Sequence, residues 1–493
     1  MVQTDDGLFL AKHDPKLDPW QFRLERRASP HSIPIGGYFL SIGPDIELVK
    51  LEDADGRPAG MVFGFAIDLP RKQALKTGVH RLDITRGSDF EAFAEGVLGR
   101  LGGRFVWFAI FDDVTRIYLD CAGLVPCVFD PDLAVAATTA AAVLDDTEYE
   151  ARFDTYLYDR LRVGRDGFFP AGKTAHKGLH RLLPNHYLDL ATWKPVRHWP
   201  KAGLQPVADP REAIAEIIEI VRGQIEALLN AGPRVAQALT AGHETRMLLG
   251  ISRQFRNDID FVTVVGSDRH SIDSIMAKRI ADGEGLNHIA LPRRTATDEQ
   301  RKTFIRRGGN CVVDSNSYYA PSVAPLVGTH NFVGGLGGEL ARGFFWHADD
   351  TPDLPITPAR LLGRFGQPNE EMLHAPLAEW IESVPDDNAL HILDLAYVEH
   401  RMGPWSGGQF CNDPTLVRYA PLFTRRSSDL MLGLPPSWKR EERMSSEAVS
   451  QTWPELNRYP YNNAGIWRAI SVKAHRVIND PWVILRRLRK MRK

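Results

Sequence analysis

Cysteine is scarce in this chain of 493 residues, which contains four: Cys121, Cys127, Cys311 and Cys411. They are scattered along the chain, and none forms a C-x-x-C pair. The sequence therefore predicts neither a disulfide framework nor a cysteine zinc site. Such sparse cysteine is typical of proteins that work in a reducing cytoplasm, and we expect a cytoplasmic location.

Long apolar runs and an excess of one charge are absent as well. No stretch reaches the ~18 uninterrupted apolar residues of a membrane-spanning helix, so we expect no integral membrane segment. The opening residues, MVQTDDGLFLAKHD, do not have the pattern of a secretory signal. The net charge of -2 gives no reason to expect nucleic acid as a partner. The basic end, VILRRLRKMRK, fits a solvated helix better than a membrane-surface helix.

Residues 1–205 are rich in short strand-like runs. MVFGFAIDL, RFVWFAIFD, RIYLD and CVFD are β-branched or aromatic segments separated by Gly, Pro and Asp. The segment SDFEAFAEGVLGRL predicts one clear helix, with Ser88 at the cap position and apolar residues at helical spacing. We predict an antiparallel α+β domain over 1–205, followed by a boundary in the Pro- and Gly-rich segment HWPKAGLQPVADPRE.

Residues 206–493 show a different period. A long helix is predicted over 209–232, and after it strand-like and helical segments alternate with short connections. The expected strands are 234–239, 259–266 and 287–292, and the expected helices are 244–255 and 271–285. This alternation predicts a parallel α/β sheet with right-handed crossovers. The chain from about residue 300 is expected to be mostly helical and irregular.

The stretch ALTAGHETRMLL joins the first of these strands to its helix. Ligands of open α/β sheets bind at such carboxyl ends. Ala241 and Gly242 have little or no side chain, so backbone N–H groups and the helix N-terminus could approach a pyrophosphate. Thr240 and Thr245 add hydroxyl groups. Glu244 would repel phosphates unless Mg²⁺ lay between them. The alternative is a plain β–α turn in which Glu244 complements the helix dipole.

Two other motifs do not fit this stretch. A phosphate loop of the G-x-x-x-x-G-K-[S/T] type would need a lysine that is missing here. A zinc H-E-x-x-H helix would need histidine at Met247.

The segment Thr240-Ala241-Gly242-His243-Glu244-Thr245 resembles the S-G-G-x-D-S pyrophosphatase loop of the asparagine synthetase-like family, each departure being a similar residue. Members use ATP and Mg²⁺ to adenylate a carboxylate, release pyrophosphate and let an amine attack to form an amide. The resemblance implies a Rossmann-like PP-loop synthetase domain over 206–493.

Three later segments are similar to the family in the same order. The first is VVGSDRHSIDSIMAKRIADGEGLNHIAL, which begins like the family's strand that faces adenine. Asp273 follows this strand and could orient the ribose or the loop. His288 matches the family's histidine, and the alternative is a capping or core residue. VGGLGGELARGFFW resembles a glycine-rich metal motif with Glu339 in the place of its aspartate and Leu336 in the place of an earlier one. A one-residue gap would match Glu339 to the motif's glutamate instead.

The segment VRYAPLFTRRSSDLMLGLPPSWKRE resembles the family's tail, after which a lysine often supports the developing charge. Lys439, Arg440 and Arg443 are the candidates, and a solvated basic face is the alternative.

The N-terminal region resembles the family's glutaminase domain, of the N-terminal-nucleophile (Ntn) hydrolase type, in GRFVWFAIFDDVTRIYLDCAGLVPCVF and LHRLLPNHYLDL. Glutamine-hydrolysing members have cysteine as their second residue, whereas this chain has Val2. Because a thiol nucleophile has no substitute there, we expect no glutamine hydrolysis.

The resemblance thus implies an AMP-forming carbon–nitrogen ligase acting on small-molecule or peptide carboxylates and amines, with a possible homodimer. The implied catalytic residues are Glu244, Glu339, Lys439 and Arg443, and the two glutamates are the implied Mg²⁺ ligands. The implied ATP-binding residues are Leu239, Thr240, Ala241, Gly242, His243, Thr245, Arg246, Val264, Val265, Gly266, Asp273, Gly335, Gly337 and Gly338.

Three rival hypotheses remain at this point. The first is a catalytically silent scaffold that keeps the nucleotide-binding fold, because longer acids displace a metal. The second is asparagine synthesis from free ammonia, and the third is a sulfur- or nucleotide-modifying pyrophosphatase.

Overall fold

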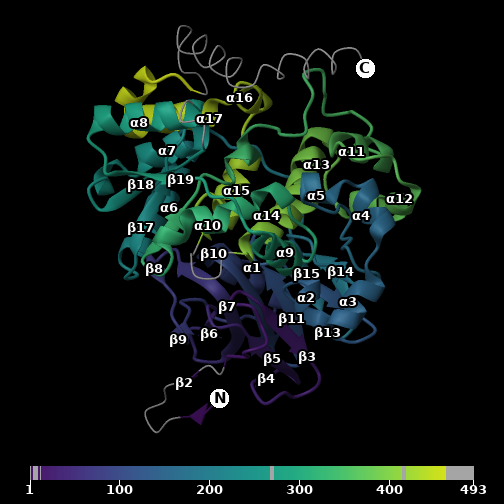
Figure 1. Cartoon of the computed structure of the whole chain (residues 1–493). Helices are drawn as coiled ribbons and strands as arrows, with labels where there is room; N and C mark the ends of the chain where they lie inside the picture. Colours follow the sequence, from purple (N-terminus) through teal and green to yellow (C-terminus); the bar gives the residue numbers. More distant parts are fainter. Residues whose placement is uncertain (1, 4–8, 11–12, 267–270, 413–417, 462–493) are drawn as a thin grey trace.

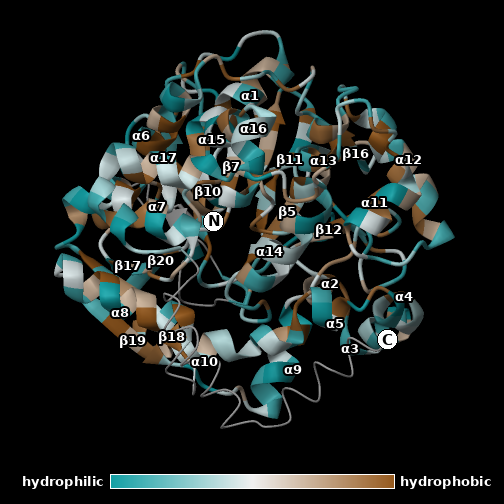
Figure 2. Cartoon of the chain, turned by 90° about the horizontal axis from the view of Figure 1, so that it is seen from above, coloured by the Kyte–Doolittle hydropathy of each residue, from teal (hydrophilic) through white to brown (hydrophobic). Residues whose placement is uncertain are grey.

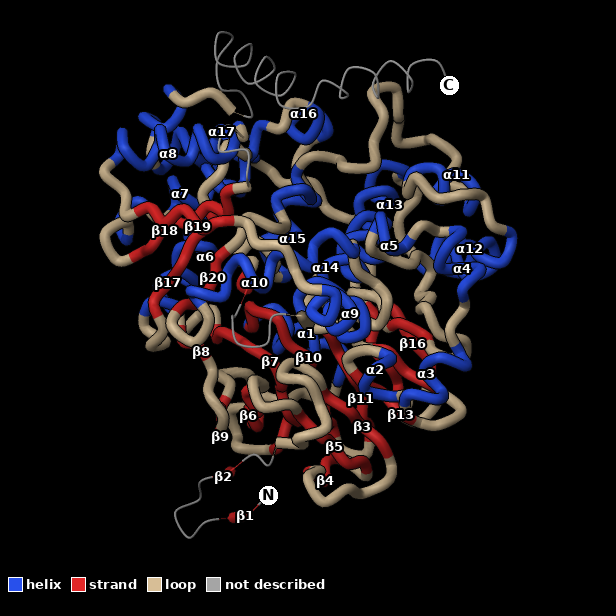
Figure 3. Tube along the Cα trace, in the orientation of Figure 1, coloured by secondary structure: helices blue, strands red, loops and turns tan. Residues whose placement is uncertain are grey.

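The computed structural model describes residues 2–3, 9–10, 13–266, 271–412 and 418–461. They form a mixed α/β structure with several sheets, one of which is parallel (Figures 1 and 3). The basic end at 483–493 lies outside the described residues, as do most of residues 1–12 apart from the pair β1 (Val2–Gln3) and β2 (Phe9–Leu10). Among the described helices, none is both long and apolar enough to cross a membrane.

The largest sheet has eight strands and is mainly antiparallel, in the order β16-β15-β11-β10-β7-β6-β9, with β8 pairing with β7. Its strands are β6 (Glu47–Glu52), β7 (Pro58–Asp68), β8 (Gln73–Ala74), β9 (Gly78–Arg81), β10 (Leu101–Phe111), β11 (Val114–Leu119), β15 (His186–Asp189) and β16 (Lys194–Arg197). Alternation along β10 explains why both faces are covered: Val106 and Phe108 join one core cluster, whereas Phe105 and Trp107 join another.

A second antiparallel sheet packs on the first through the larger cluster, where the rings of Phe22 and Phe63 lie 4.7 Å apart. Its order is β14-β12-β13-β3-β5-β4. The strands are β3 (Phe22–Glu25), β4 (Ile33–Ile35), β5 (Tyr38–Ile42), β12 (Val128–Asp130), β13 (Val135–Ala137) and β14 (His180–Arg181). The prediction of antiparallel strands with helices over residues 1–205 is confirmed.

Helices cover the outer faces of the two sheets. Helix α1 (Phe90–Arg100) packs Phe93 against Trp107 of β10, while α2 (Ala140–Val143) and α3 (Asp146–Arg152) pack on the six-stranded sheet. The helix over 90–100 was predicted, but its cap was placed wrongly. Asp89, not Ser88, accepts the N–H groups of Glu91 and Ala92, because a carboxylate one residue nearer the helix reaches both.

The parallel sheet has the order β19-β18-β17-β20-β21. Its strands are β17 (Arg234–Ala238), β18 (Ile259–Val265), β19 (His288–Pro292), β20 (His330–Val333) and β21 (Arg418–Tyr419). The helices α6 (Pro210–Leu229), α7 (His243–Ile251) and α8 (Ile272–Glu284) alternate with its first strands, as predicted. β20 and β21 were not predicted, since each is short and lies in a region that was expected to be mostly helical and irregular.

The remaining helices gather beside this sheet and above the antiparallel pair (Figure 1). They are α4 (Thr155–Arg160), α5 (Val163–Asp166), α9 (Asp298–Arg307), α10 (Tyr319–Val323), α11 (Pro358–Arg364), α12 (His374–Ser383), α13 (Ala389–Ala396), α14 (Gly403–Phe410), α15 (Arg425–Leu432), α16 (Pro436–Arg440) and α17 (Arg443–Thr452). A π-helical turn over Tyr397–Met402 joins α13 to α14. Seen from above, brown apolar residues colour the strands β18 and β19, and teal polar residues lie on many of the helices (Figure 2).

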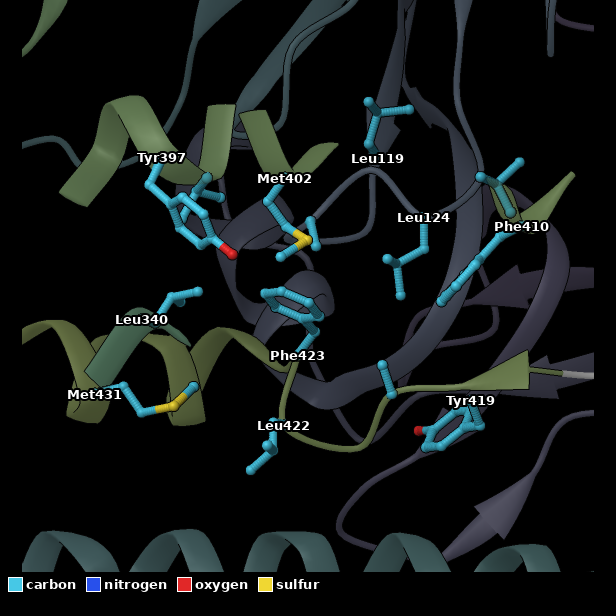
Figure 4. Packing of buried hydrophobic residues seen from close by; sticks show 14 of the residues in the cluster. Leu119, Leu124, Leu340, Tyr397, Met402, Phe410, Tyr419, Leu422, Phe423 and Met431 are labelled. Atoms are coloured by element: carbon cyan, nitrogen blue, oxygen red, sulfur yellow. The ribbon is translucent and has the colours of Figure 1, made fainter. Parts of the chain in front are cut away.

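Apolar side chains from both halves of the chain share one core. Leu119 and Leu124 from the first half approach Met402, Phe410 and Phe423 from the second (Figure 4).

Candidate functional site

The loop after β17 occupies the carboxyl end of the strand at the centre of the parallel sheet. Its residues bond to one another: the Thr240 and Thr245 hydroxyls are 2.7 Å apart, and the Gly242 N–H donates to Thr240 Oγ1 at 3.0 Å. Gly242 caps α7 and supplies no side-chain acceptor for the first turn. The helix therefore presents its N-terminal N–H groups without a side-chain cap, which suits an anion.

Asp273, at the start of α8, holds this loop from the neighbouring element. Its Oδ1 accepts the Ala241 N–H at 3.0 Å. Of the two roles predicted for Asp273, orienting the loop is the one with a visible contact.

A glycine-rich turn follows β20, which is hydrogen-bonded to β17 along its length. Because the two strands are parallel neighbours, both loops emerge at the same edge. The contact between them is close: a Cβ at Gly335 would lie 2.7 Å from Glu244 Cβ, and one at Gly338 would lie 2.6 Å from Glu244 Cγ. Gly337 has φ +110°, a conformation that side chains rarely adopt. The glycines are therefore required by close approach to α7 and by the turn itself.

Glu244 and Glu339 converge on a single cation, Arg342. Arg342 Nη2 lies 2.7 Å from Glu244 Oε1 and 3.6 Å from Glu339 Oε1. The two carboxylate oxygens are therefore separated by no more than the sum of these distances, which places both acids at one site. Glu339 also accepts the Gly337 N–H at 2.9 Å, which fixes its orientation.

The acid pair lies in a sheltered environment. Burial, and then the neighbouring Glu244, raise the pKa of the Glu339 carboxyl above its usual value. Both side chains are less than one-fifth exposed, at 17% and 19%. Two such acids with one arginine between them carry a net negative charge, and carboxylate oxygens are ligands that Mg²⁺ accepts, so the donor set fits a divalent cation.

Tyr397 forms one wall beside the acids. Burial, and then Glu339, raise the pKa of its hydroxyl well above the usual value. Its ring lies 4.5 Å from that of Phe344, a residue that is 51% exposed. Figure 4 shows Tyr397 beside Leu340 and Met402, with its hydroxyl directed toward the interior. Neither Tyr397 nor Arg342 was identified from the sequence, because no motif marks them. The one signal in the sequence was the position of Arg342 three residues after Glu339.

Arg246 and His243, both expected at the nucleotide, have other contacts. Arg246 is fully buried and donates to the carbonyls of Tyr459 and Pro460. The His243 ring stacks on Tyr461 at 4.4 Å. These two residues anchor the start of α7 to the segment that follows α17. Leu239 is also fully buried, and it reaches β18 through its N–H.

The basic residues predicted after the tail motif do not reach the acid pair. Lys439 is 1% exposed, and its Nζ donates to Asp394 at 2.5 Å and to the Leu432 carbonyl at 2.8 Å. Arg440 donates to the carbonyls of His347, Ala348 and Asp350.

Arg443 lies over the Trp438 ring, at 4.2 Å. The turn just before Arg443 nevertheless borders the site, because Glu442 Oε2 is 3.9 Å from Arg342 Nη1.

The segment expected to face adenine opens into a cavity of about 970 Å³. Val265, Gly266, Ser274 and Arg293 are among its lining residues, whereas Val264 packs in a cluster with strand residues. His288 also borders the cavity, and its Nε2 bonds to Thr263 Oγ1 at 2.9 Å, which agrees with the structural alternative for this histidine.

Three of the four cysteines are thiols whose surroundings disfavour the thiolate. Burial raises the pKa of the Cys121, Cys127 and Cys411 thiols to about 12. Such thiols stay protonated near neutral pH.

A scan against models of known protein families finds no match for this chain, and a search of curated proteins finds none either.

Proposed function

We propose that this protein is an ATP- and Mg²⁺-dependent ligase that joins a carboxylate to an amine. The carboxylate oxygen would attack the α-phosphorus of ATP, and the bond to pyrophosphate would break. The amine nitrogen would then attack the acyl carbon, so that an amide forms and AMP leaves, with release of the amine proton.

One observation carries the proposal: Glu244 and Glu339, which are far apart in the sequence, converge on Arg342 beside an uncapped helix N-terminus. An acid pair beside N–H groups that could bind phosphate would repel the phosphate, unless a divalent cation lay between the carboxylates and the phosphate oxygens. Bound there, Mg²⁺ would supply positive charge to the departing pyrophosphate.

The chain's own groups would do the positioning. Thr240, Gly242 and Thr245, with the first turn of α7, would bind the pyrophosphate. Glu244 and Glu339 would hold the metal, and Asp273 would keep the loop in place through Ala241. The cavity beside Val265 and Gly266 would take the base. Catalysis would then depend on alignment and charge neutralisation rather than on a covalent nucleophile.

The test is ATP–pyrophosphate exchange across a panel of carboxylates. Wild-type protein should exchange with at least one acid, and Glu244→Ala should lower the rate by about 10³-fold or more, since a preorganised charge partner is lost. Glu216→Ala removes an exposed glutamate of α6 and serves as the matched control. Exchange that is unchanged in Glu244→Ala would remove the metal assignment.

A second candidate function is a catalytically silent scaffold. It is favoured by Arg342, which already neutralises part of the acid pair, and by the internal use of the Ala241 and Gly242 N–H groups. A scaffold should bind nucleotide or nothing, and should show no exchange with any acid in the panel.

We also propose that glutamine is not the source of the amine. The first cysteine, Cys121, has a raised pKa, and its thiol stays protonated near neutral pH. Glutamate release from glutamine should equal the background rate, whereas ammonia or a substrate amine should support amide formation.

A further inference from the structure

We infer that Arg342 is a binding residue of this site, which holds the two glutamates in the nucleotide-free protein and passes to the phosphates when a metal–nucleotide complex arrives. The inference rests on the proposed function, because it assigns a role to the same acid pair. It predicts that free divalent metal binds weakly and that metal and nucleotide bind together.

The guanidinium lies where a bridging cation would lie. Nη2 contacts Glu244 at 2.7 Å and Glu339 at 3.6 Å, and Nη1 is 3.9 Å from Glu442. A divalent ion that approached the two carboxylates would meet a fixed positive charge within a few ångströms. That repulsion, in a sheltered site, opposes the binding of metal alone.

The same geometry allows the guanidinium to leave. Arg342 lies in the short segment after η4 (Gly338–Ala341) and its side chain remains 26% exposed. Its Nε has no hydrogen-bond partner within the described part of the chain, so the fork is not fully engaged. A triphosphate offers pairs of phosphate oxygens that can accept from such a planar fork in a bidentate manner, which frees the carboxylates for the metal.

Arg342 contacts the acid pair directly, whereas other basic residues expected at the site have different partners. Lys439 is committed to Asp394 and to a carbonyl, and Arg246 is committed to the carbonyls of Tyr459 and Pro460. Arg342, in contrast, forms ion pairs with both acids of the site.

The experiment is a Mn²⁺ titration of the full chain, followed by electron paramagnetic resonance, with and without a non-hydrolysable ATP analogue. Without nucleotide, Arg342→Gln should bind Mn²⁺ at least about tenfold more tightly than wild type, because the competing charge is gone. With the analogue present, wild type should gain affinity for Mn²⁺ by a larger factor than Arg342→Gln does. Arg426→Gln, which removes an exposed arginine paired with Glu216, should behave as wild type in both titrations.

Three further outcomes complete the test. Arg342→Lys keeps the charge and loses the fork, so it should bind free Mn²⁺ as weakly as wild type but gain less affinity than wild type when the analogue is present. If the glutamine variant fails to fold, this smaller gain is the test, and a gain equal to that of wild type overturns the inference. Glu339→Gln in the Arg342→Gln background should abolish the gain, which locates it at the acid pair. Equal nucleotide-free Mn²⁺ affinity in wild type and Arg342→Gln overturns the inference.

This test is separable from that of the ligase. If pyrophosphate exchange fails with every acid while the Mn²⁺ titrations follow the expected order, the proposed function fails and the role of Arg342 stands. If exchange works and the two Mn²⁺ affinities are equal, the ligase stands and the role of Arg342 fails.

Discussion

Replacing Arg197 with methionine should destabilise the protein through a buried carboxylate that is not one of the acid pair. Glu399, in the π-helical turn after Tyr397, is fully buried and accepts from both Arg197 Nη atoms at 2.8 Å. Asn185 and Trp380 also donate to it, at 2.9 and 2.6 Å. The cluster fastens the turn that carries Tyr397 to β16 and to the residues before β15.

The magnitude follows from the pKa of Glu399. Burial alone would raise that pKa, but Arg197 and the other donors outweigh burial and lower it from 4.5 to about 2. At ~1.4 kcal/mol per pKa unit, this difference corresponds to about 3 kcal/mol, which agrees with the ~3–5 kcal/mol lost when one partner of a buried pair is removed. For a cooperative unit of this length we expect Tm to fall by about 3 °C.

Differential scanning calorimetry at pH 7.5 measures the loss, with Arg165→Met as the control because that arginine is 63% exposed. The double variant Arg197→Met with Glu399→Gln should recover at least half of it, since no buried charge is then left unpaired. The contribution is present above the unfolded pKa near 4.5 and is lost as the pH falls toward 2. The reasoning is refuted if Arg197→Met melts with wild type, or if the double variant is less stable than the single one.

Four further predictions concern the site and its surroundings. Gly335→Ala should lower pyrophosphate exchange by about tenfold or more, because its Cβ would meet Glu244 Cβ at 2.7 Å. The control is Gly363→Ala in α11, whose Cβ meets nothing within 4 Å and which should keep full exchange. Asp273→Ala should raise the KM for ATP by about fivefold with Tm nearly unchanged, since the Ala241 N–H loses its acceptor; an unchanged KM contradicts the loop role. Iodoacetamide at pH 8 should label Cys121, Cys127 and Cys411 only after denaturation, given thiol pKa values of about 12, and mass spectrometry of the native protein would reveal any exception. Burial lowers the pKa of His186 to about 4 and that of His400 to about 3. Below about pH 6.5 the unfolded state therefore takes up protons that the folded state does not, and Tm should fall. A Tm that stays level from pH 7.5 to 5 argues against this.

The sequence by itself determined the elements whose residues repeat with a clear period. The apolar stripe of α6 predicts a helix, because it buries one face over several turns. The β-branched run of β18 predicts a strand, because consecutive residues of it are buried on both faces. The place of the loop at 239–242 followed in the same way, since a strand and a helix on either side define a carboxyl end. Glu244 could be singled out because an acid is unusual beside small residues at such a point.

The tertiary structure alone decided what depends on contacts between distant segments. The short strands β20 and β21 join the sheet through pairing with a neighbouring strand, which no local pattern of four or two residues can signal. The same holds for the polar groups of the site. The sequence offered Lys439 and Arg443 as the supporting cations, but the fold buries Lys439 against Asp394 and brings Arg342 between the glutamates. The charge of each side chain follows from the sequence. Its ion-pair partner depends on which loops the strand order brings to the same edge of the sheet.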